Sequence, residues 1–246
     1  PGIIYMRSRR ETEELASWLQ TQSINKDKQY LRTEAYHAGL PTKDRRRIEQ
    51  EWLAGKCKFI VCTSAFGLGI NNPNTRWVLH YQAPLTLAEY IQEVGRAGRD
   101  RKPADALMLV SEPTGWLDAS DRTRQTFFLQ QQQNLQQKAQ ALIPKLPKQG
   151  NFADVTRKYP EAAIALGLLH GVGKLIWHTP FEYEIQPGKH HFASIDETPL
   201  EQMQAYISTR GCRWAFLMQA FGFESGNLRC GTCDRCRPNK PDKLIY

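Results

Sequence analysis

The first 115 residues alternate between short apolar runs and helical segments, and this alternation restricts the fold more than any other feature of the sequence. The apolar runs lie at 3–6, 35–37, 58–62, 77–81 and 106–110. Segments with helical apolar spacing or helix-boundary residues separate them, at about 10–20, 43–54 and 85–97. Strands joined through helices of this length run parallel, with helices on both faces of the sheet. The sequence therefore predicts an α/β domain with a parallel sheet over 1–115.

The character of the sequence changes after Pro113. Residues 129–140 are rich in glutamine and have an apolar edge, which favours a helix that bridges domains over a disordered spacer. We therefore predict a helical, glutamine-rich connector over 116–150, which ends in a linker that contains two prolines and a glycine.

Two further parts are expected in the rest of the chain. Residues 151–198 give two short helices and then a β-hairpin, the order of a winged helix, although a small α+β insert that only packs fits the same pattern. Residues 199–246 begin with two helices that share an apolar side, namely Met203, Ile207, Trp214, Leu217, Met218 and Phe221.

Four cysteines in the last part have the spacing of a metal site. Seventeen residues separate Cys212 from Cys230, and two-residue gaps then lead to Cys233 and Cys236. Such gaps allow neighbouring thiolates to turn onto one tetrahedral zinc ion, and four thiolates leave no open position for catalysis. We therefore predict a structural zinc, with a redox pair or an iron–sulfur cluster as the alternatives. Cys57 and Cys62 flank a strand and are interpreted as small buried residues.

Net charge and cysteine use indicate the partners and the compartment. The chain has 33 Lys and Arg against 25 Asp and Glu, a formal charge of +8, which favours polyanions such as nucleic acid. No apolar run approaches the roughly 18 residues of a membrane helix. Cysteines in metal-like spacing favour a reducing cytoplasm over a secreted disulfide protein. The chain opens directly into a predicted strand without methionine, so we expect it to be part of a longer protein.

The sequence YIQEVGRAGRD at 90–100 holds two arginines three residues apart, which we expect on the last turn of a helix and on one side of it. The guanidinium groups of Arg96 and Arg99 are always charged and fork onto phosphate oxygens, which suits the charge that develops in phosphoryl transfer. A pair of surface arginines without function is the alternative. Upstream, a buried strand leads Thr63 and Ser64 into a glycine-rich turn, AFGLGIN, whose hydroxyl and N–H groups can hold phosphate oxygens.

In this order and spacing, the two segments resemble motifs V and VI of superfamily-2 helicases, and most closely those of the RecQ family. Residues 3–19 are similar to the motif IV region of that family, and YHAGL at 36–40 is similar to the segment that follows it. The cysteine region resembles the RecQ zinc subdomain. The resemblance covers about 1–112 and 200–237.

This resemblance implies the second RecA-like lobe of a motor that hydrolyses ATP with Mg²⁺ between two lobes and moves 3′ to 5′ along single-stranded DNA. Forked DNA is the expected partner for unwinding, and no membrane partner is expected. Arg99 would be the arginine finger that reaches the γ-phosphate, with Arg96 beside it. The other implied site residues are Gln92 in the same cluster, Gly69 and Asn71 in the ATP cleft, and Ser8, Thr63 and Ser64 at DNA phosphates.

The sequence departs from the family pattern in two respects. It has neither the phosphate loop Gly-x-x-x-x-Gly-Lys-[Ser/Thr] nor Asp-Glu-x-His, so we expect this chain alone to be inactive as an ATPase. The winged-helix-like unit precedes the cysteines, whereas in the family it often follows them. The alternatives are a non-enzymatic, zinc-containing DNA-binding module and, less in keeping with the cysteines, an RNA helicase or a chromatin-remodelling motor.

Overall fold

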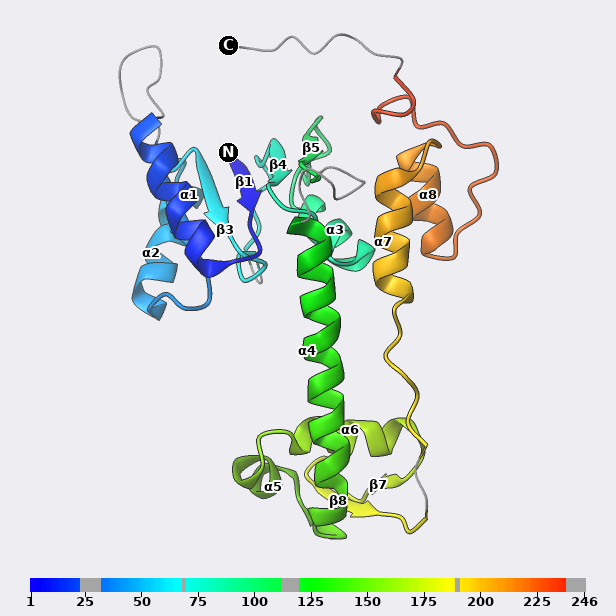
Figure 1. Cartoon of the computed structure of the whole chain (residues 1–246). Coiled ribbons are helices and arrows are strands. Elements are labelled where there is room, and N and C mark those ends of the chain that lie inside the picture. Colours follow the sequence, from blue (N-terminus) through cyan, green and yellow to red (C-terminus); the bar gives the residue numbers. More distant parts are fainter. Residues whose placement is uncertain (23–31, 68–69, 112–119, 189–190, 238–246) are drawn as a thin grey trace. The chain divides into compact units, whose positions relative to one another are not determined.

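The computed structural model describes residues 1–22, 32–67, 70–111, 120–188 and 191–237 of the chain. The chain divides into two compact units, one formed by 1–121 with 198–246 and the other by 122–197. Figure 1 shows the helices and strands of both units.

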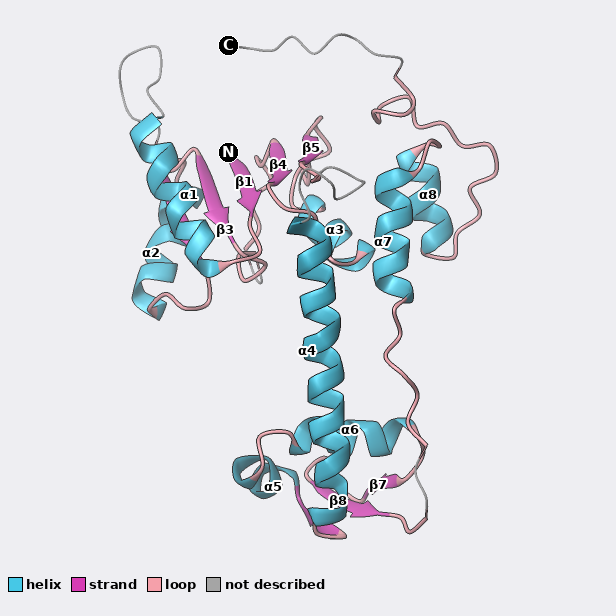
Figure 2. Cartoon of the chain, in the orientation of Figure 1, coloured by secondary structure: helices cyan, strands magenta, loops and turns pink. Residues whose placement is uncertain are grey.

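The first unit contains a five-stranded sheet whose neighbouring strands are all parallel (Figure 2). The order across the sheet is β2-β3-β1-β4-β5. The strands are β1 (Gly2–Tyr5), β2 (Thr33–Tyr36), β3 (Phe59–Cys62), β4 (Trp77–His80) and β5 (Asp105–Met108). Parallel strands end at the same edge of a sheet, so the segments that follow β1, β3 and β4 lie side by side. The predicted parallel sheet is confirmed.

Helices cover both faces of this sheet. Successive residues of β1 point to opposite faces, so they pack into two different cores. Ile3 belongs to the core that includes Trp52, whereas Ile4 packs with Ala16. These helical contacts come from α2 (Thr42–Leu53) and α1 (Arg9–Gln22) respectively. The layered arrangement follows directly from apolar strands between helical segments.

The third helix of the sheet domain, α3 (Leu87–Val94), ends earlier than the sequence indicates. The predicted helix to Ala97 is therefore wrong, and both arginines lie beyond the helix rather than on its last turn. Gly98 has φ +69°, a left-handed conformation that an α-helix cannot contain, and its N–H donates to the Thr75 carbonyl at 3.1 Å. This bond ties the turn after α3, residues 95–101, to the segment before β4.

Two further helices, α7 (Thr198–Ser208) and α8 (Arg213–Ala220), complete the first unit, as the sequence predicts. Met203 and Leu217 are buried in a core that includes Leu87 of α3. Trp214 and Phe221, predicted on the same apolar side, do not lie in this core and are 53% and 47% exposed. Cys212 precedes α8 as its N-cap residue.

The second unit consists of α4 (Ser120–Leu142), the 3-10 turn η1 (Ile143–Lys145) and a small sheet of order β6-β8-β7 with two helices. In chain order these are β6 (Gln149–Asn151), α5 (Phe152–Lys158), α6 (Ala162–Gly171), β7 (Leu175–Trp177) and β8 (Glu182–Ile185). The glutamine-rich stretch is helical, and the two expected helices and the hairpin are present. Within the described ranges, no helix has the combined length and apolarity to span a membrane.

The linker expected at Pro144, Pro147 and Gly150 is wrong. Ile143 and Leu146, which lie on either side of Pro144, are buried in the core of the second unit. Gly150 pairs with Tyr183 in the antiparallel sheet. This segment is thus structural, because the end of α4 and the first strand both pack into the same core.

Candidate anion-binding pocket and metal centre

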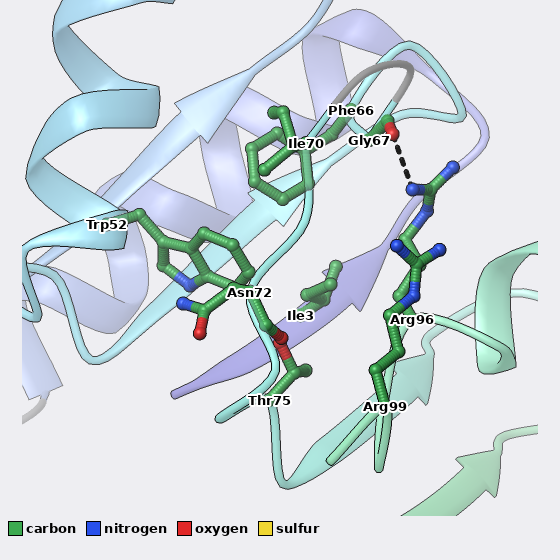
Figure 3. Close-up of a pocket in the computed structure, with 9 residues that line it drawn as sticks. All are labelled: Ile3, Trp52, Phe66, Gly67, Ile70, Asn72, Thr75, Arg96 and Arg99. Carbon is green, nitrogen blue, oxygen red and sulfur yellow. Dashed lines mark hydrogen bonds between the residues drawn. The ribbon is translucent and has the colours of Figure 1, made fainter.

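A small pocket in the first unit brings the two predicted arginines together (Figure 3). It is formed by β1, α2, the turn that follows β3, the segment before β4 and the turn after α3. The lining residues are Ile3, Trp52, Phe66, Gly67, Ile70, Asn72, Thr75, Arg96 and Arg99. The pocket therefore has an apolar floor and a positively charged side.

The guanidinium group of Arg96 is half-buried and donates a hydrogen bond from Nη1 to the Gly67 carbonyl oxygen (Figure 3). Its Nε is buried and has no hydrogen-bond partner in the part of the chain that the structure describes. Gly67 has φ +114°, and a Cβ atom there would overlap the guanidinium group. Only glycine at this position allows the arginine to lie against the backbone.

Arg99 is exposed and is held at two points. Its Nε donates to the Gly95 carbonyl at 3.0 Å, and its Nη1 donates to the Asn71 side-chain oxygen at 3.1 Å. Among the described residues, no carboxylate forms an ion pair with Arg96 or Arg99. Two guanidinium groups held at one pocket without an acidic partner among the described residues could hold an anion.

The residues predicted to bind DNA phosphates do not line this pocket. Ser8, Thr63 and Ser64 follow β1 and β3, neighbouring strands that end at the same edge of the sheet. Ser8 Oγ accepts the Glu11 N–H at 3.4 Å, and Thr63 Oγ1 accepts the Ala65 N–H at 3.4 Å. Since both hydroxyls act as acceptors in these contacts, each can still donate its proton to a phosphate oxygen.

Two predicted residues do not contribute to the pocket as described. Gln92 is exposed on α3 and does not line it. Gly69 lies outside the described residues.

Three charged or polar residues that sequence reasoning missed, Arg7, His80 and Glu93, form a buried cluster beside the pocket. Arg7 binds both carboxylate oxygens of Glu93, at 3.1 Å and 2.7 Å, and His80 Nε2 lies 2.8 Å from Oε2 of the same carboxylate. Their side chains are only 11%, 0% and 6% exposed, respectively. This contact joins the segments at the ends of β1 and β4 to α3.

The charge state of Glu93 follows from these neighbours. Burial alone raises the pKa of the carboxyl group, but the hydrogen bond with His80 and the positive charge of Arg7 outweigh it, so the pKa lies below its usual value. Glu93 is thus a carboxylate at neutral pH. Two features of the sequence could have indicated this cluster. Polar residues stand at the ends of apolar strands, and an acidic residue stands three positions before Arg96.

The four predicted metal ligands, Cys212, Cys230, Cys233 and Cys236, do come together. Their sulfur atoms all lie within 4.8 Å of one another, and those of Cys230 and Cys236 are 3.9 Å apart. Zinc bound by four thiolates at ~2.3 Å requires sulfur atoms roughly 3.8 Å apart, so the cluster fits this ion. The chain's cysteines would thus hold zinc as a closed structural site.

Hydrogen bonds around Cys230 favour its thiolate. The N–H and hydroxyl groups of Thr232 lie 3.4 Å from its sulfur, and the Cys233 N–H lies 3.3 Å away. Against the effect of burial, these donors lower the pKa of Cys230 to about 6. The cysteine loop is fastened to α8 by a bidentate contact between Arg213 and Asp234, at 3.0 Å and 2.9 Å.

Cys57 and Cys62 are buried, as predicted. Burial raises the pKa of the Cys57 thiol to about 11, so it remains protonated. Two carboxylates near Cys57, those of Glu34 and Glu51, are already paired with Arg32 and Arg47. Glu34, Glu51 and Cys57 could together be taken for metal ligands, but ion pairing explains why the two carboxylates lie here.

Comparisons with known proteins match both the sheet domain and the cysteine region. Residues 1–101 match the Helicase conserved C-terminal domain, and residues 181–237 match the RecQ zinc-binding domain. The ATP-dependent DNA helicase RecQ of Synechocystis sp. is 47% identical over 239 residues, which cover 96% of this chain and 48% of that protein. The probable ATP-dependent DNA helicase RecS of Bacillus subtilis is 39% identical over 109 residues, 44% of this chain and 21% of that protein.

A solved structure of Mycobacterium smegmatis helicase Lhr bound to ssDNA and AMP-PNP is 20% identical, covers 83% of this chain and 29% of that chain, and has a TM-score of 0.42. The chain spans about half the length of the first relative above.

The parallel sheet and the matched helicase domain define the first unit's lobe as a RecA-like helicase C-terminal lobe. The match to the RecQ zinc-binding domain and the 47% identity over 96% of the chain identify one family among helicases with this lobe. The chain belongs to the RecQ family. The family assignment argues against the RNA-helicase and chromatin-remodelling alternatives.

We predict that Glu93→Gln lowers the free energy of unfolding by about 3–5 kcal/mol at pH 7, because it removes the buried carboxylate that lies 2.7 Å from the buried Arg7 guanidinium. Glu89→Gln on the same helix is the matched control, since Glu89 is 41% exposed and 3.9 Å from Arg7, and we expect about 1 kcal/mol or less. Urea denaturation monitored at tryptophan measures both. Because the pKa of Glu93 is lowered by folding, its contribution is present above about pH 4.5 and disappears as the pH falls further. Equal effects of the two variants would contradict this account.

We predict that Cys230→Ser lowers the zinc content from one ion per chain and increases hydrogen exchange in α8 and in residues 222–237. The physical reason is that the four thiolates hold a loop that otherwise has few buried residues. Exchange in β1, β3 and the second unit provides the internal control and is expected to stay unchanged. A stoichiometric metal content in the variant would show that this sulfur is not a ligand.

Proposed function

We propose that this chain is the second motor lobe and zinc-binding region of a RecQ-type, ATP-dependent DNA helicase. Arg99 would act as the arginine finger at the γ-phosphate, with Arg96 beside it. The observation that carries the proposal is a pair of guanidinium groups fixed by neutral partners at one pocket, with no carboxylate paired to either in the described ranges.

The chemistry of phosphoryl transfer explains why such a pair is useful. Negative charge is spread over the phosphate oxygens in the transition state, and a guanidinium group placed in advance stabilises it without reorganisation. Asn71 and the Gly95 carbonyl hold Arg99 in place while leaving part of its guanidinium group exposed. The Gly67 carbonyl holds Arg96 in the same way.

The chain supplies positive charge but not the whole ATP site. Its sequence has no phosphate loop and no Asp-Glu-x-His for Mg²⁺ and the attacking water, and these would come from a first lobe. Gly69 and Asn71 would line the same cleft, and Gln92 would belong to the cluster of Arg96 and Arg99. ATP hydrolysis is therefore proposed for an assembly of two lobes.

DNA would be held at the edge of the sheet where β1 and β3 end. Ser8, Thr63 and Ser64 are proposed to donate hydrogen bonds to phosphates of single-stranded DNA, contacts that carry no sequence preference. Ser8 directly follows Arg7 in the chain. Arg7 binds Glu93, and Glu93 lies three residues before Arg96. A DNA contact at Ser8 and the position of the arginines would thus share one rigid connection. We propose that the two-lobe protein moves 3′ to 5′ along single-stranded DNA and opens forked DNA.

We predict that Arg99→Ala, in a protein that includes both lobes, lowers DNA-stimulated ATP turnover about 10³-fold or more. Zinc content and affinity for single-stranded DNA are expected to remain nearly unchanged, because Arg99 is exposed and distant in sequence from the cysteines. Arg101→Gln, an exposed arginine of the same turn, provides the control. A variant with normal turnover would show that Arg99 is not the arginine finger.

We predict that the purified 246-residue chain shows no ATP turnover above a blank and no tight ATP binding, because it lacks the phosphate loop. Phosphate release and fluorescent-nucleotide titration test the two statements separately. The same preparation is expected to bind single-stranded oligonucleotide. Measurable turnover would contradict the proposal that a first lobe supplies the residues needed for ATP hydrolysis.

A further inference from the structure

The turn that carries Arg99, residues 95–101, lies between α3 and β5 and is held at two places. Its first residues follow directly from α3, whose end is fixed by the buried cluster around Glu93. Two residues further along have a left-handed backbone, Gly98 with φ +69° and Arg101 with φ +64°. A residue with a side chain keeps this conformation only where its surroundings hold it. The direction of Arg99 therefore depends on contacts at the far end of the turn.

Arg76, the residue before β4, makes four hydrogen bonds through its guanidinium group. Its Nε donates to the Asn74 carbonyl at 3.1 Å, and its Nη2 donates to the Pro73 carbonyl at 2.6 Å. Its Nη1 donates to the Pro103 carbonyl at 3.2 Å, and its Nη2 also donates to Oδ1 of Asp100 at 2.7 Å. The first two acceptors lie in the segment before β4, whereas the other two follow the arginine pair. One guanidinium group thus joins the two segments that border the pocket.

Asp100 is the partner of Arg76 within the turn, and it directly follows Arg99. Its Oδ1 also accepts the Lys102 N–H at 3.2 Å. The hydrogen bond from Arg76 lowers the pKa of Asp100, so this side chain is a carboxylate at neutral pH. In the described ranges Asp100 pairs with Arg76 and forms no ion pair with its neighbour Arg99. The contact therefore fixes the backbone beside Arg99 and leaves the charge of Arg99 available.

A second contact reaches Arg99 from the same segment before β4. The side-chain oxygen of Asn71 accepts the hydrogen bond from Arg99 Nη1 at 3.1 Å. The guanidinium group of Arg99 is thus bound to this segment directly, and its backbone is bound through the pair of Arg76 and Asp100. Such precision matters for catalysis, because a misplacement of about 1 Å can lower a reaction rate by about 10²-fold.

A contribution to stability alone would be the simplest role for the ion pair. The side chains of Arg76 and Asp100 are 32% and 18% exposed, and ion pairs in contact with water contribute little to folding. The four acceptors of Arg76 all lie in connecting segments and not in a helix or a strand. The contact therefore fixes the local geometry of the turn more than it stabilises the sheet.

We propose that Arg76 and Asp100 are positioning residues for Arg99, which hold the turn so that the Arg99 guanidinium group is placed for the γ-phosphate. The inference rests on the proposed role of Arg99 and extends it to two residues that do not touch the nucleotide. They act on the rate of the chemical step through the arginine and not on the binding of ATP or DNA.

The first test measures ATP turnover in a protein that includes both lobes, at saturating single-stranded DNA. Arg76→Gln and Asp100→Ala are each expected to lower kcat about 10-fold or more. KM for ATP is expected to change less than about twofold, because an interaction made only in the transition state affects kcat alone. Arg32→Gln is the matched control, since Arg32 lies 2.7 Å from Glu51 in an ion pair of the same length that does not border the pocket. Its kcat is expected to be normal.

The second test combines Arg76→Gln with Arg99→Ala and compares single-turnover rates of ATP hydrolysis. If Arg76 acts through Arg99, its substitution causes no further loss once Arg99 is absent. Equal fold losses with and without Arg99 would show that Arg76 acts independently of it, which overturns the proposal. Normal kcat in both Arg76→Gln and Asp100→Ala overturns it as well.

Urea denaturation of the same variants separates positioning from loss of the fold. Arg76→Gln is expected to unfold at nearly the same urea concentration as Arg32→Gln. A much lower midpoint for Arg76→Gln, together with the loss of kcat, would assign the ion pair to global stability and overturn its positioning role. Normal turnover by Arg99→Ala alone would instead contradict the proposed function itself, and the two failures are thus distinguishable.

Discussion

The contact of Arg7 and His80 with Glu93 is the interaction on which the geometry of the first unit depends. It joins β1 and β4 to α3 through one buried carboxylate. Burying opposite charges costs desolvation energy, which good hydrogen-bond geometry offsets only in part. Its role is therefore positional: removing one partner leaves an uncompensated buried charge, whereas the intact cluster fixes the end of α3. From that end the chain turns, and the turn places Arg96 and Arg99 at the pocket.

Helix α3 is also the element to which the zinc-binding region attaches. Leu87 shares a core with Met203 and Leu217, and the rings of Tyr90 and Tyr206 lie 5.1 Å apart. Arg213 continues this contact, since it donates to the Tyr206 carbonyl and binds Asp234 of the cysteine loop. Thus α3 is held by the sheet on one side and by α7 and α8 on another. The cysteine loop is therefore connected to the turn that carries Arg96 and Arg99 through the packing of this helix.

The sequence was sufficient for features whose signals are local. Apolar strands between helical segments predict a parallel sheet, and two-residue gaps between Cys230, Cys233 and Cys236 predict a metal knuckle. The partners of Glu93 could not be predicted, because Arg7 is 86 residues away and only the sheet brings them together. The end of α3 was missed because it depends on the bond from Gly98 to Thr75. At 143–150, proline and glycine are typical of linkers, but burial of Ile143 depends on tertiary packing that composition does not encode.

The same cluster limits how the lobe can respond to a ligand. Ser8 directly follows Arg7, and its hydroxyl caps α1, so a ligand at Ser8 acts on a backbone fixed at both sides. For α3 to shift relative to β1, both bonds between Arg7 and Glu93 would have to break inside the protein, without water to replace them. Packed and hydrogen-bonded elements of this kind move together. The sheet, α3 and the segment at Ser8 are therefore expected to move as one body.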